Sequence, residues 1–283
     1  MKVRKITAKL IKELKDLQGN RTEMQHSAID FISNTYRRNE PIEFLRRNFN
    51  PTDSGEIETS EVFQTSVGLY ISSLVTCWET LFRDLFIHVI NNDRDIYDRT
   101  CSYLKSEQLE TLNSAEISES EFMSKSFNFQ DLSDTCKAFN FLFKRKEDKI
   151  TDYFNDVGDE RFNFSSPNYI LIWLGKNTYF AKEEIFNNLE KAFEIRHKVI
   201  HDANFRSYLS WEEINKLEDC LMIFPQFIIN WLAVKYNQNR LLANNNNVFQ
   251  MKSTDVPIEG WSAKIWGKCD FYNVEYEVLE DEK

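Results

Sequence analysis

The stretch Ile185–Asp202, IFNNLEKAFEIRHKVIHD, carries the pattern on which the fold prediction depends. Placed on a helix at about 100° per residue, its apolar side chains gather in one broad stripe: Ile185, Phe186, Leu189, Ala192, Phe193, Val199 and Ile200. Arg196 falls near the centre of the stripe, His197 at its edge, and His201 one turn after His197. A guanidinium keeps its charge and is costly to bury alone. The sequence therefore predicts that a carboxylate or an anionic ligand neutralises Arg196.

The residues of this turn also resemble a known motif. RHKVIH, Arg196–His201, looks like the Arg-x4-His motif of HEPN domains (higher eukaryotes and prokaryotes nucleotide-binding), in which a polar residue often follows the Arg. CWETLFRDLF, Cys77–Phe86, is similar to an early helix of that family, and the likeness covers about residues 61–236. HEPN domains are small antiparallel helical bundles. Many are metal-independent endoribonucleases of RNA processing, toxin–antitoxin and antiviral defence systems.

The resemblance implies a role for each residue of the motif. His201 would transfer protons, Arg196 would stabilise the phosphate, and His197 would be a supporting donor. HEPN nucleases usually build a composite site where two motif helices meet, so the resemblance implies a homodimer through the motif helix, with no metal and no cofactor. It also implies an antitoxin or defence-system partner protein. One family variant that pairs with a nucleotidyltransferase antitoxin has a Tyr where this chain has Ala203, so that particular partnership is in doubt.

These residue types suit a reaction in which RNA is cleaved by its own 2′-OH group. The 2′-oxygen attacks the adjacent phosphorus while a base removes its proton, and an acid protonates the departing 5′-oxygen. Histidine transfers protons near neutral pH. Arginine holds phosphoryl oxygens with fixed donors and stabilises the charge that develops on them. The products are a 2′,3′-cyclic phosphate and a 5′-OH.

The sequence also allows structural roles for the same residues. Arg196 can be a structural residue paired with Glu79 or Asp84, in which case its loss strands a carboxylate and destabilises the fold. His201 can be a helix C-terminal residue stabilised by the helix dipole. The i, i+4 spacing of His197 and His201 also matches a two-ligand metal arrangement, but the sequence offers no evident third ligand.

Composition limits the fold class. The chain has 283 residues, 42% of them hydrophobic, including 23 Phe, so it can bury a sizeable core. Seven Gly and five Pro argue against a turn-rich β fold and for long helices. The net charge of −10 argues against a general nucleic-acid binder but leaves room for a local basic site. Five Cys without a Cys-x-x-Cys pair predict reduced thiols in a cytoplasmic protein.

No membrane association is expected. The N-terminal sequence MKVRKITAKLIKELKDL is basic and amphipathic, but it lacks the apolar segment and cleavage site of a signal peptide. The longest apolar run, Cys220–Val234, is interrupted by Pro225, Gln226 and Asn230. It is too short and too polar to span a bilayer.

The longest helix predicted by apolar periodicity is Glu61–Ile90. Its apolar stripe is so wide that other helices must pack against a large part of its circumference. This helix should therefore be central to the bundle, with Trp78 fully enclosed. Glu79 and Asp84 flank the stripe, and either could reach Arg196 if the two helices pack side by side.

The sequence predicts an all-α antiparallel bundle in three regions: an N-terminal helical extension at 1–58, a HEPN-like domain at 59–236, and an Asn-rich linker with a short tail at 237–283. Further helices are expected at Ile6–Leu17, Glu23–Arg38, Asp95–Leu112, Phe129–Phe143 and Ser210–Tyr236. Loops are expected around Pro41–Gly55, at Asn113–Asn128 and at Phe154–Ser166. Tyr169–Gly175 reads as a helical turn or a strand, and Trp261–Leu279 as a short β-hairpin. Arg37, Arg38, Arg46 and Arg47 read as a solvated face or as part of an RNA path.

Three functional hypotheses follow. The first is a metal-independent endoribonuclease that acts on RNA, in a toxin or antiviral role. The second is a HEPN-like module that binds nucleotide, RNA or protein without cleaving, and the third is an unrelated helical scaffold. The Arg–His–His cluster favours the first hypothesis, whereas the acidic net charge favours the other two.

Overall fold

The computed structural model describes the chain in eleven segments. They are residues 5–18, 24–48, 60–157, 161–165, 170–173, 179–238, 240–244, 249–252, 261–267, 270–273 and 275–277. The expected domain boundary at residue 58 and residues 49–55 of the loop expected around Pro41–Gly55 lie outside these segments.

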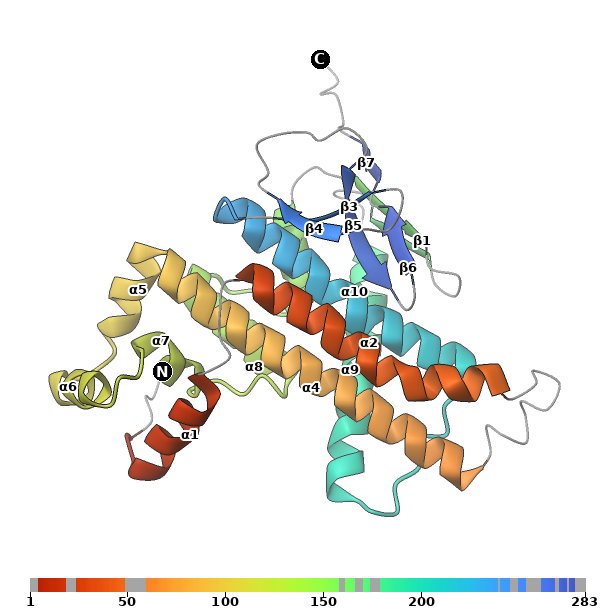
Figure 1. The fold of residues 1–283 in the computed structure, drawn as a ribbon, viewed down its shortest axis with the longest axis horizontal. Coiled ribbons are helices and arrows are strands. Elements are labelled where there is room, and N and C mark those ends of the chain that lie inside the picture. Colours follow the sequence, from red (N-terminus) through yellow and green to blue (C-terminus); the bar gives the residue numbers. More distant parts are fainter. Residues whose placement is uncertain are drawn as a thin grey trace.

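The expected helical bundle is confirmed (Figure 1). Its helices in chain order are α1 Ala8–Gln18, α2 Met24–Asn48, α4 Glu61–Asn92, α5 Arg94–Cys101, α6 Ser106–Ser114, α7 Glu119–Ser124, α8 Leu132–Phe143, the 3-10 helix η2 Ile150–Val157, α9 Tyr179–His201 and α10 Trp211–Lys235. Helix α10 ends beside the boundary expected after residue 236.

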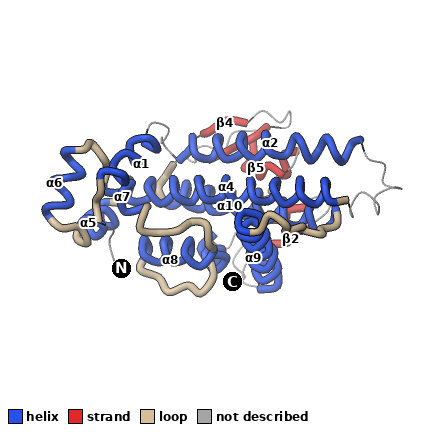
Figure 2. Tube along the Cα trace, turned by 90° about the horizontal axis from the view of Figure 1, so that it is seen from below, coloured by secondary structure: helices blue, strands red, loops and turns tan. Residues whose placement is uncertain are grey.

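Helix α4 is the central element. Figure 2 shows α2 along one side of α4 and helices α8 and α9 on the other, with α9 seen nearly end-on as it crosses. Helices α1, α5, α6 and α7 form one end of the molecule. The last turns of α9 project at the lower edge of Figure 1, where residues 202–210 lead back to α10.

Local sequence explains where α4 begins and ends. The Ser60 hydroxyl accepts a hydrogen bond from the Phe63 amide at 3.2 Å, which satisfies one of the free donors of the first turn. The Asp93 amide donates to the Val89 carbonyl at the C-terminus, and the Asp93 carboxylate accepts from the Ile96 amide at 3.0 Å. Asp93 therefore ends α4 and also starts α5.

Helix α2 corrects two expectations about the N-terminal region. It continues through Pro41 to Asn48, where the sequence predicted a loop, because Ile42 is buried against the bundle. Arg46, expected on a solvated face or an RNA path, instead bonds Glu218 of α10 at 2.7 Å and also pairs with Glu43. Glu218 is fully buried, so this ion pair fastens the end of α2 to α10.

The middle of the chain is more helical than expected. The single helix expected at Asp95–Leu112 is broken by residues 102–105 into α5 and α6. The polar connection expected at Asn113–Asn128 contains α7, whose N-terminus is capped by Ser118. Serines that read as loop residues in the sequence therefore cap and line a short buried helix.

Helix α10 starts as the sequence predicts. Ser210 and Glu213 form a reciprocal capping box, with the Glu213 amide donating to Ser210 Oγ at 3.3 Å and the Ser210 amide to Glu213 Oε2 at 2.9 Å. Pro225 lies inside the helix, which continues to Lys235. Nearly every residue from Leu217 to Ala233 is buried, because the helices cover one side and strands the other.

Two small antiparallel sheets complete the fold. One has the order β2-β1-β7, with β1 Arg161–Ser165, β2 Ile170–Trp173 and β7 Glu275–Glu277. The other has the order β4-β3-β5-β6, with β3 Arg240–Asn244, β4 Phe249–Lys252, β5 Trp261–Gly267 and β6 Asp270–Asn273. The β5–β6 pairing fits the hairpin expected in the tail, whereas β1 lies where a loop was expected.

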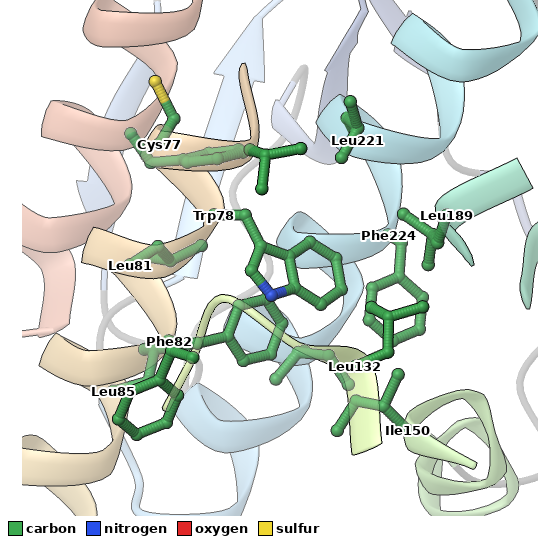
Figure 3. Close-up of a cluster of buried hydrophobic side chains, with 14 of the residues drawn as sticks. Cys77, Trp78, Leu81, Phe82, Leu85, Leu132, Ile150, Leu189, Leu221 and Phe224 are labelled. Atoms are coloured by element: carbon green, nitrogen blue, oxygen red, sulfur yellow. The ribbon is translucent and has the colours of Figure 1, made fainter. Parts of the chain in front are cut away.

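The core is centred on Trp78, which is fully buried as expected (Figure 3). Its indole stacks on Phe82 with ring centroids 4.2 Å apart and meets Phe224 at 5.4 Å and Phe193 at 5.5 Å. These contacts join α4, α9 and α10. Trp78 Nε1 is buried without a hydrogen-bond partner among the described residues.

We predict that Trp78→Ala lowers the free energy of unfolding by about 3–5 kcal/mol, because it removes a large side chain from a fully enclosed position. Trp78→Phe should cost much less, since it keeps a ring in the cluster and removes the unpaired indole N–H. Chemical denaturation of both variants tests this. If the Trp78→Ala protein were as stable as the parent, the Trp78 side chain could not be fully buried in the core.

Candidate functional site

The motif residues lie in the last two turns of α9. Helix α9 ends at His201, and the Asp202 amide closes the last turn by donating to the Lys198 carbonyl at 2.8 Å. The buried side of this helix carries Ile185, Leu189 and Ala192, as the apolar stripe predicted. The fold therefore fixes the orientation of the motif through the packed half of α9.

Arg196 is neutralised by Glu79 of α4. Arg196 Nη2 lies 2.7 Å from Glu79 Oε1, and the two side chains are only 13% and 8% exposed. The sequence left a carboxylate or an anionic ligand as alternatives, and a carboxylate fills this role. An ion pair with so little solvent around it is strongly coupled to the fold, because either charge alone would be buried unpaired.

Gln130 completes the surroundings of Glu79. Its amide Nε2 donates to Glu79 Oε2 at 3.0 Å from the turn before α8. Nothing in the sequence marked Gln130, since it lies 51 residues from Glu79 in the chain. Asp84, the other expected partner of Arg196, faces the opposite way and lines a hollow between α2 and α4 with Asp30 and Arg38.

His197 and His201 are both exposed, on consecutive turns of α9. Their ring centroids are 4.6 Å apart, with an angle of 52° between the rings. One imidazole can donate a proton while its neighbour accepts one, so the pair offers both an acid and a base on a single helix face. The motif therefore presents two imidazoles to solvent and one guanidinium mostly turned inward.

The end of α9 approaches the α4 backbone closely at a glycine. A Cβ added to Gly68 would lie 2.9 Å from Val199 Cγ2, closer than such atoms come in proteins. The absence of a side chain at Gly68 thus lets the last turn of α9 lie directly on the α4 backbone. Val199 is stiff at χ1 and cannot easily move aside.

We predict that Gly68→Ala destabilises the protein, because overpacking at such a contact costs about 1–3 kcal/mol and exceeds the helix propensity gained. In a Val199→Ala background, Gly68→Ala should destabilise the protein by at least about 1 kcal/mol less than it does in the parent, because the clashing methyl group of Val199 is gone. A double-mutant cycle from denaturation curves measures this coupling. A coupling near zero would mean that the two helices are not in contact there.

The loop after the motif is fastened to α4 by Gln64. The Leu209 amide donates to Gln64 Oε1 at 3.0 Å, and Gln64 Nε2 donates back to the Leu209 carbonyl at 3.3 Å. Ser207 Oγ donates to the same Gln64 Oε1 at 2.8 Å. A side-chain amide therefore pairs with the loop backbone as a neighbouring strand would. Sequence reasoning missed Gln64, because its partners are known only from the fold.

The other described residues offer no second site of this kind. Burial lowers the pKa of His88 to about 4, so His88 is neutral at ordinary pH, and His26 lies where side chains are not described. No cluster of three His, Cys, Asp or Glu residues suited to a metal ion occurs among the described residues. Of the helices described, none is long and apolar enough to cross a bilayer.

Comparison of the chain with protein-family models, with curated proteins and with solved structures finds no match.

The Arg196–Glu79 pair generates a stability prediction. Arg196→Met should lower the free energy of unfolding by about 3 kcal/mol, because it leaves the Glu79 carboxylate buried without its cation. Adding Glu79→Leu should recover most of the loss, since a buried ion pair can be replaced by apolar side chains at little cost. Urea denaturation of the single and double variants tests this. Equal stability of Arg196→Met and the parent would contradict a buried pair.

Proposed function

We propose that the chain is a metal-independent endoribonuclease that resembles HEPN nucleases, with His201, His197 and Arg196 as its active residues. The observation that carries the proposal is the exposed imidazole pair of His197 and His201, 4.6 Å apart, on the same two turns of α9 as Arg196. The helical bundle around them agrees with the resemblance. The proposal includes a cytoplasmic location and a role in toxin or antiviral defence.

In the proposed reaction the 2′-oxygen of RNA forms a bond to the adjacent phosphorus. One imidazole of the pair takes the 2′ proton, and the P–O5′ bond breaks as the other imidazole protonates the 5′-oxygen. Arg196 stabilises the charge on the phosphoryl oxygens. The bonds balance without any further reactant, and the products are a 2′,3′-cyclic phosphate and a 5′-OH.

Glu79 supports this role of Arg196. A carboxylate at 2.7 Å holds the guanidinium in one place and lowers the number of conformations it must give up when a phosphate binds. Gln130 holds Glu79 in turn through its second oxygen at 3.0 Å. We therefore assign Glu79 and Gln130 as positioning residues, with no direct contact to RNA. Asp84 has no part in the proposed reaction.

We predict that His201→Ala lowers RNA cleavage, or the cellular toxicity that reports it, about 100-fold or more, because proton transfer by a side chain contributes that much. Its melting temperature should stay near the parent value, since His201 is exposed. Arg196→Lys should have a comparable effect on cleavage while keeping the charge beside Glu79. Arg196→Ala should also abolish cleavage, but it loses stability as well.

The controls address the mechanism. Cleavage should continue in EDTA, and a substrate with a 2′-deoxy residue at the scissile position should resist, because its attacking oxygen is absent. Inhibition by EDTA would instead favour a metal held by His197 and His201.

The proposal includes a homodimer that brings two motif helices together, so that the Arg196 and the imidazoles of a second protomer complete the site. Its support is the apolar surface beside the motif: Ile200, in the last turn of α9, is 52% exposed, and Leu69, next to Gly68 on α4, is 59% exposed. Such side chains are stabilised by burial against a second surface. An antitoxin or defence-system protein is a further proposed partner.

We predict that the chain is a dimer at micromolar concentration and that Ile200→Glu makes it monomeric and inactive. Light scattering during size-exclusion chromatography measures the mass, and Val62→Glu on α4 is a control at an apolar side chain that is more exposed than Ile200. A monomer that cleaves RNA at the parental rate would contradict the composite site.

One observation favours the alternative of a non-catalytic HEPN-like module that binds nucleotide, RNA or protein. Arg196 already has an internal carboxylate partner, so its charge is accounted for without any ligand. If His201→Ala and Arg196→Lys leave every RNA-directed activity unchanged, the module replaces the nuclease.

A further inference from the structure

Tyr208 combines an unusual backbone conformation with an exposed ring. Its φ is 46°, in the left-handed region that bulky residues rarely adopt, and 72% of its surface is accessible. Packing of the ring does not compensate for this conformation, because the ring is mostly in solvent. Strain held at an exposed aromatic residue calls for a functional explanation.

The neighbours of Tyr208 hold it in this conformation. Ser207 bonds Gln64 through its hydroxyl at 2.8 Å, and Leu209, 2% exposed, bonds the same amide through its own backbone at 3.0 and 3.3 Å. Tyr208 is thus presented between two fixed points. A residue whose backbone is fixed in this way gives up only side-chain freedom when a flat partner binds to its ring.

Gln64, which anchors Ser207 and Leu209, lies next to the motif helix. Gln64, which holds the loop, and Gly68, which contacts Val199 of α9, are one turn apart on α4. The rise of an α-helix over four residues is about 6 Å. The anchor of Tyr208 and the last turn of the motif helix therefore rest on consecutive turns of the same helix.

Two basic residues, Arg206 and Lys198, lie in or next to the loop that carries Tyr208. Arg206 Nη1 donates to the carbonyl of Phe205 at 2.9 Å, which holds the guanidinium in the loop two residues before Tyr208. Arg206 Nη2 lies 4.0 Å from the Glu61 carboxylate, which is mostly in solvent. Lys198 lies over the Phe205 ring at 5.7 Å and also pairs with Glu194, a carboxylate that is mostly in solvent. A loop that carries a guanidinium two residues before an exposed aromatic ring suits a phosphodiester chain with unstacked bases.

We propose that Tyr208 is a stacking platform for a nucleobase of the single-stranded RNA that the motif cleaves. This inference rests on the proposed function and assigns the residue that places the scissile phosphate beside His201. Arg206 contributes charge next to the same nucleotide.

The test measures binding separately from cleavage. The probe is a single-stranded RNA whose 2′ positions are O-methylated, so that no 2′-OH can attack, with 2-aminopurine as a fluorescent base. Tyr208→Ala should weaken binding about tenfold, which corresponds to about 1.4 kcal/mol, and should abolish the quenching of 2-aminopurine that stacking causes. Tyr208→Trp should keep both. Phe44→Ala, which removes a 64% exposed aromatic ring from α2, should change neither.

Tyr208→Gly separates the functional role from a structural one. Glycine adopts positive φ without strain, so this variant should melt at or above the parental temperature while binding the probe as weakly as Tyr208→Ala. A lower melting temperature for both variants, with unchanged quenching, would make Tyr208 structural and overturn the inference.

The outcomes distinguish this inference from the function on which it rests. If His201→Ala abolishes cleavage but Tyr208→Ala binds the probe like the parent, only the stacking role is wrong. If the parent neither binds the probe nor cleaves RNA, both are wrong. If Tyr208→Ala changes the mass of the protein in solution rather than its affinity for the probe, the ring belongs to a contact between copies of the chain and not to an RNA site.

Discussion

The close contact between α4 and α9 at Gly68 is the constraint on which the rest of the structure depends. It allows Val199 to lie on the α4 backbone, brings Arg196 within 2.7 Å of Glu79 a few turns away, and closes the aromatic cluster around Trp78. Because these contacts join the same two helices, a change in their separation would alter the core and the motif together. The site is therefore built on a tightly packed contact between the two helices.

The Arg196–Glu79 pair couples stability to the proposed chemistry. A buried ion pair contributes little net stability, but the loss of one partner is expensive. In a nuclease the pair would hold the guanidinium ready for a phosphate, while the imidazoles of His197 and His201 stay in solvent where substrate can reach them. The separation of an enclosed cation from exposed proton-transfer groups suits a site that opens onto a surface rather than into a cavity.

The acidic charge of the chain also has a physical consequence. With a net charge of −10 the protein as a whole repels a polyanion, so binding has to depend on a few groups in the right geometry. Arg46 illustrates this point, because Glu218 and Glu43 neutralise its charge within the fold and it is not available to a polyanion. An exposed ring such as that of Tyr208 attracts a base without any dependence on charge.

By itself the sequence determined the elements whose signals are local. Apolar periodicity located α4, α9 and α10, the Ser210–Glu213 spacing located a helix start, and an Arg inside an apolar stripe required a partner. It could not determine the rest, because those features depend on contacts between distant residues. Only the tertiary structure decided that Glu79 and not Asp84 pairs with Arg196, that Gln130 supports Glu79, that Pro41 lies within a helix, and that Gln64 holds Tyr208 in a left-handed conformation. Apolar periodicity predicts which residues of a helix share a face, but it does not predict which face of another helix packs against that face.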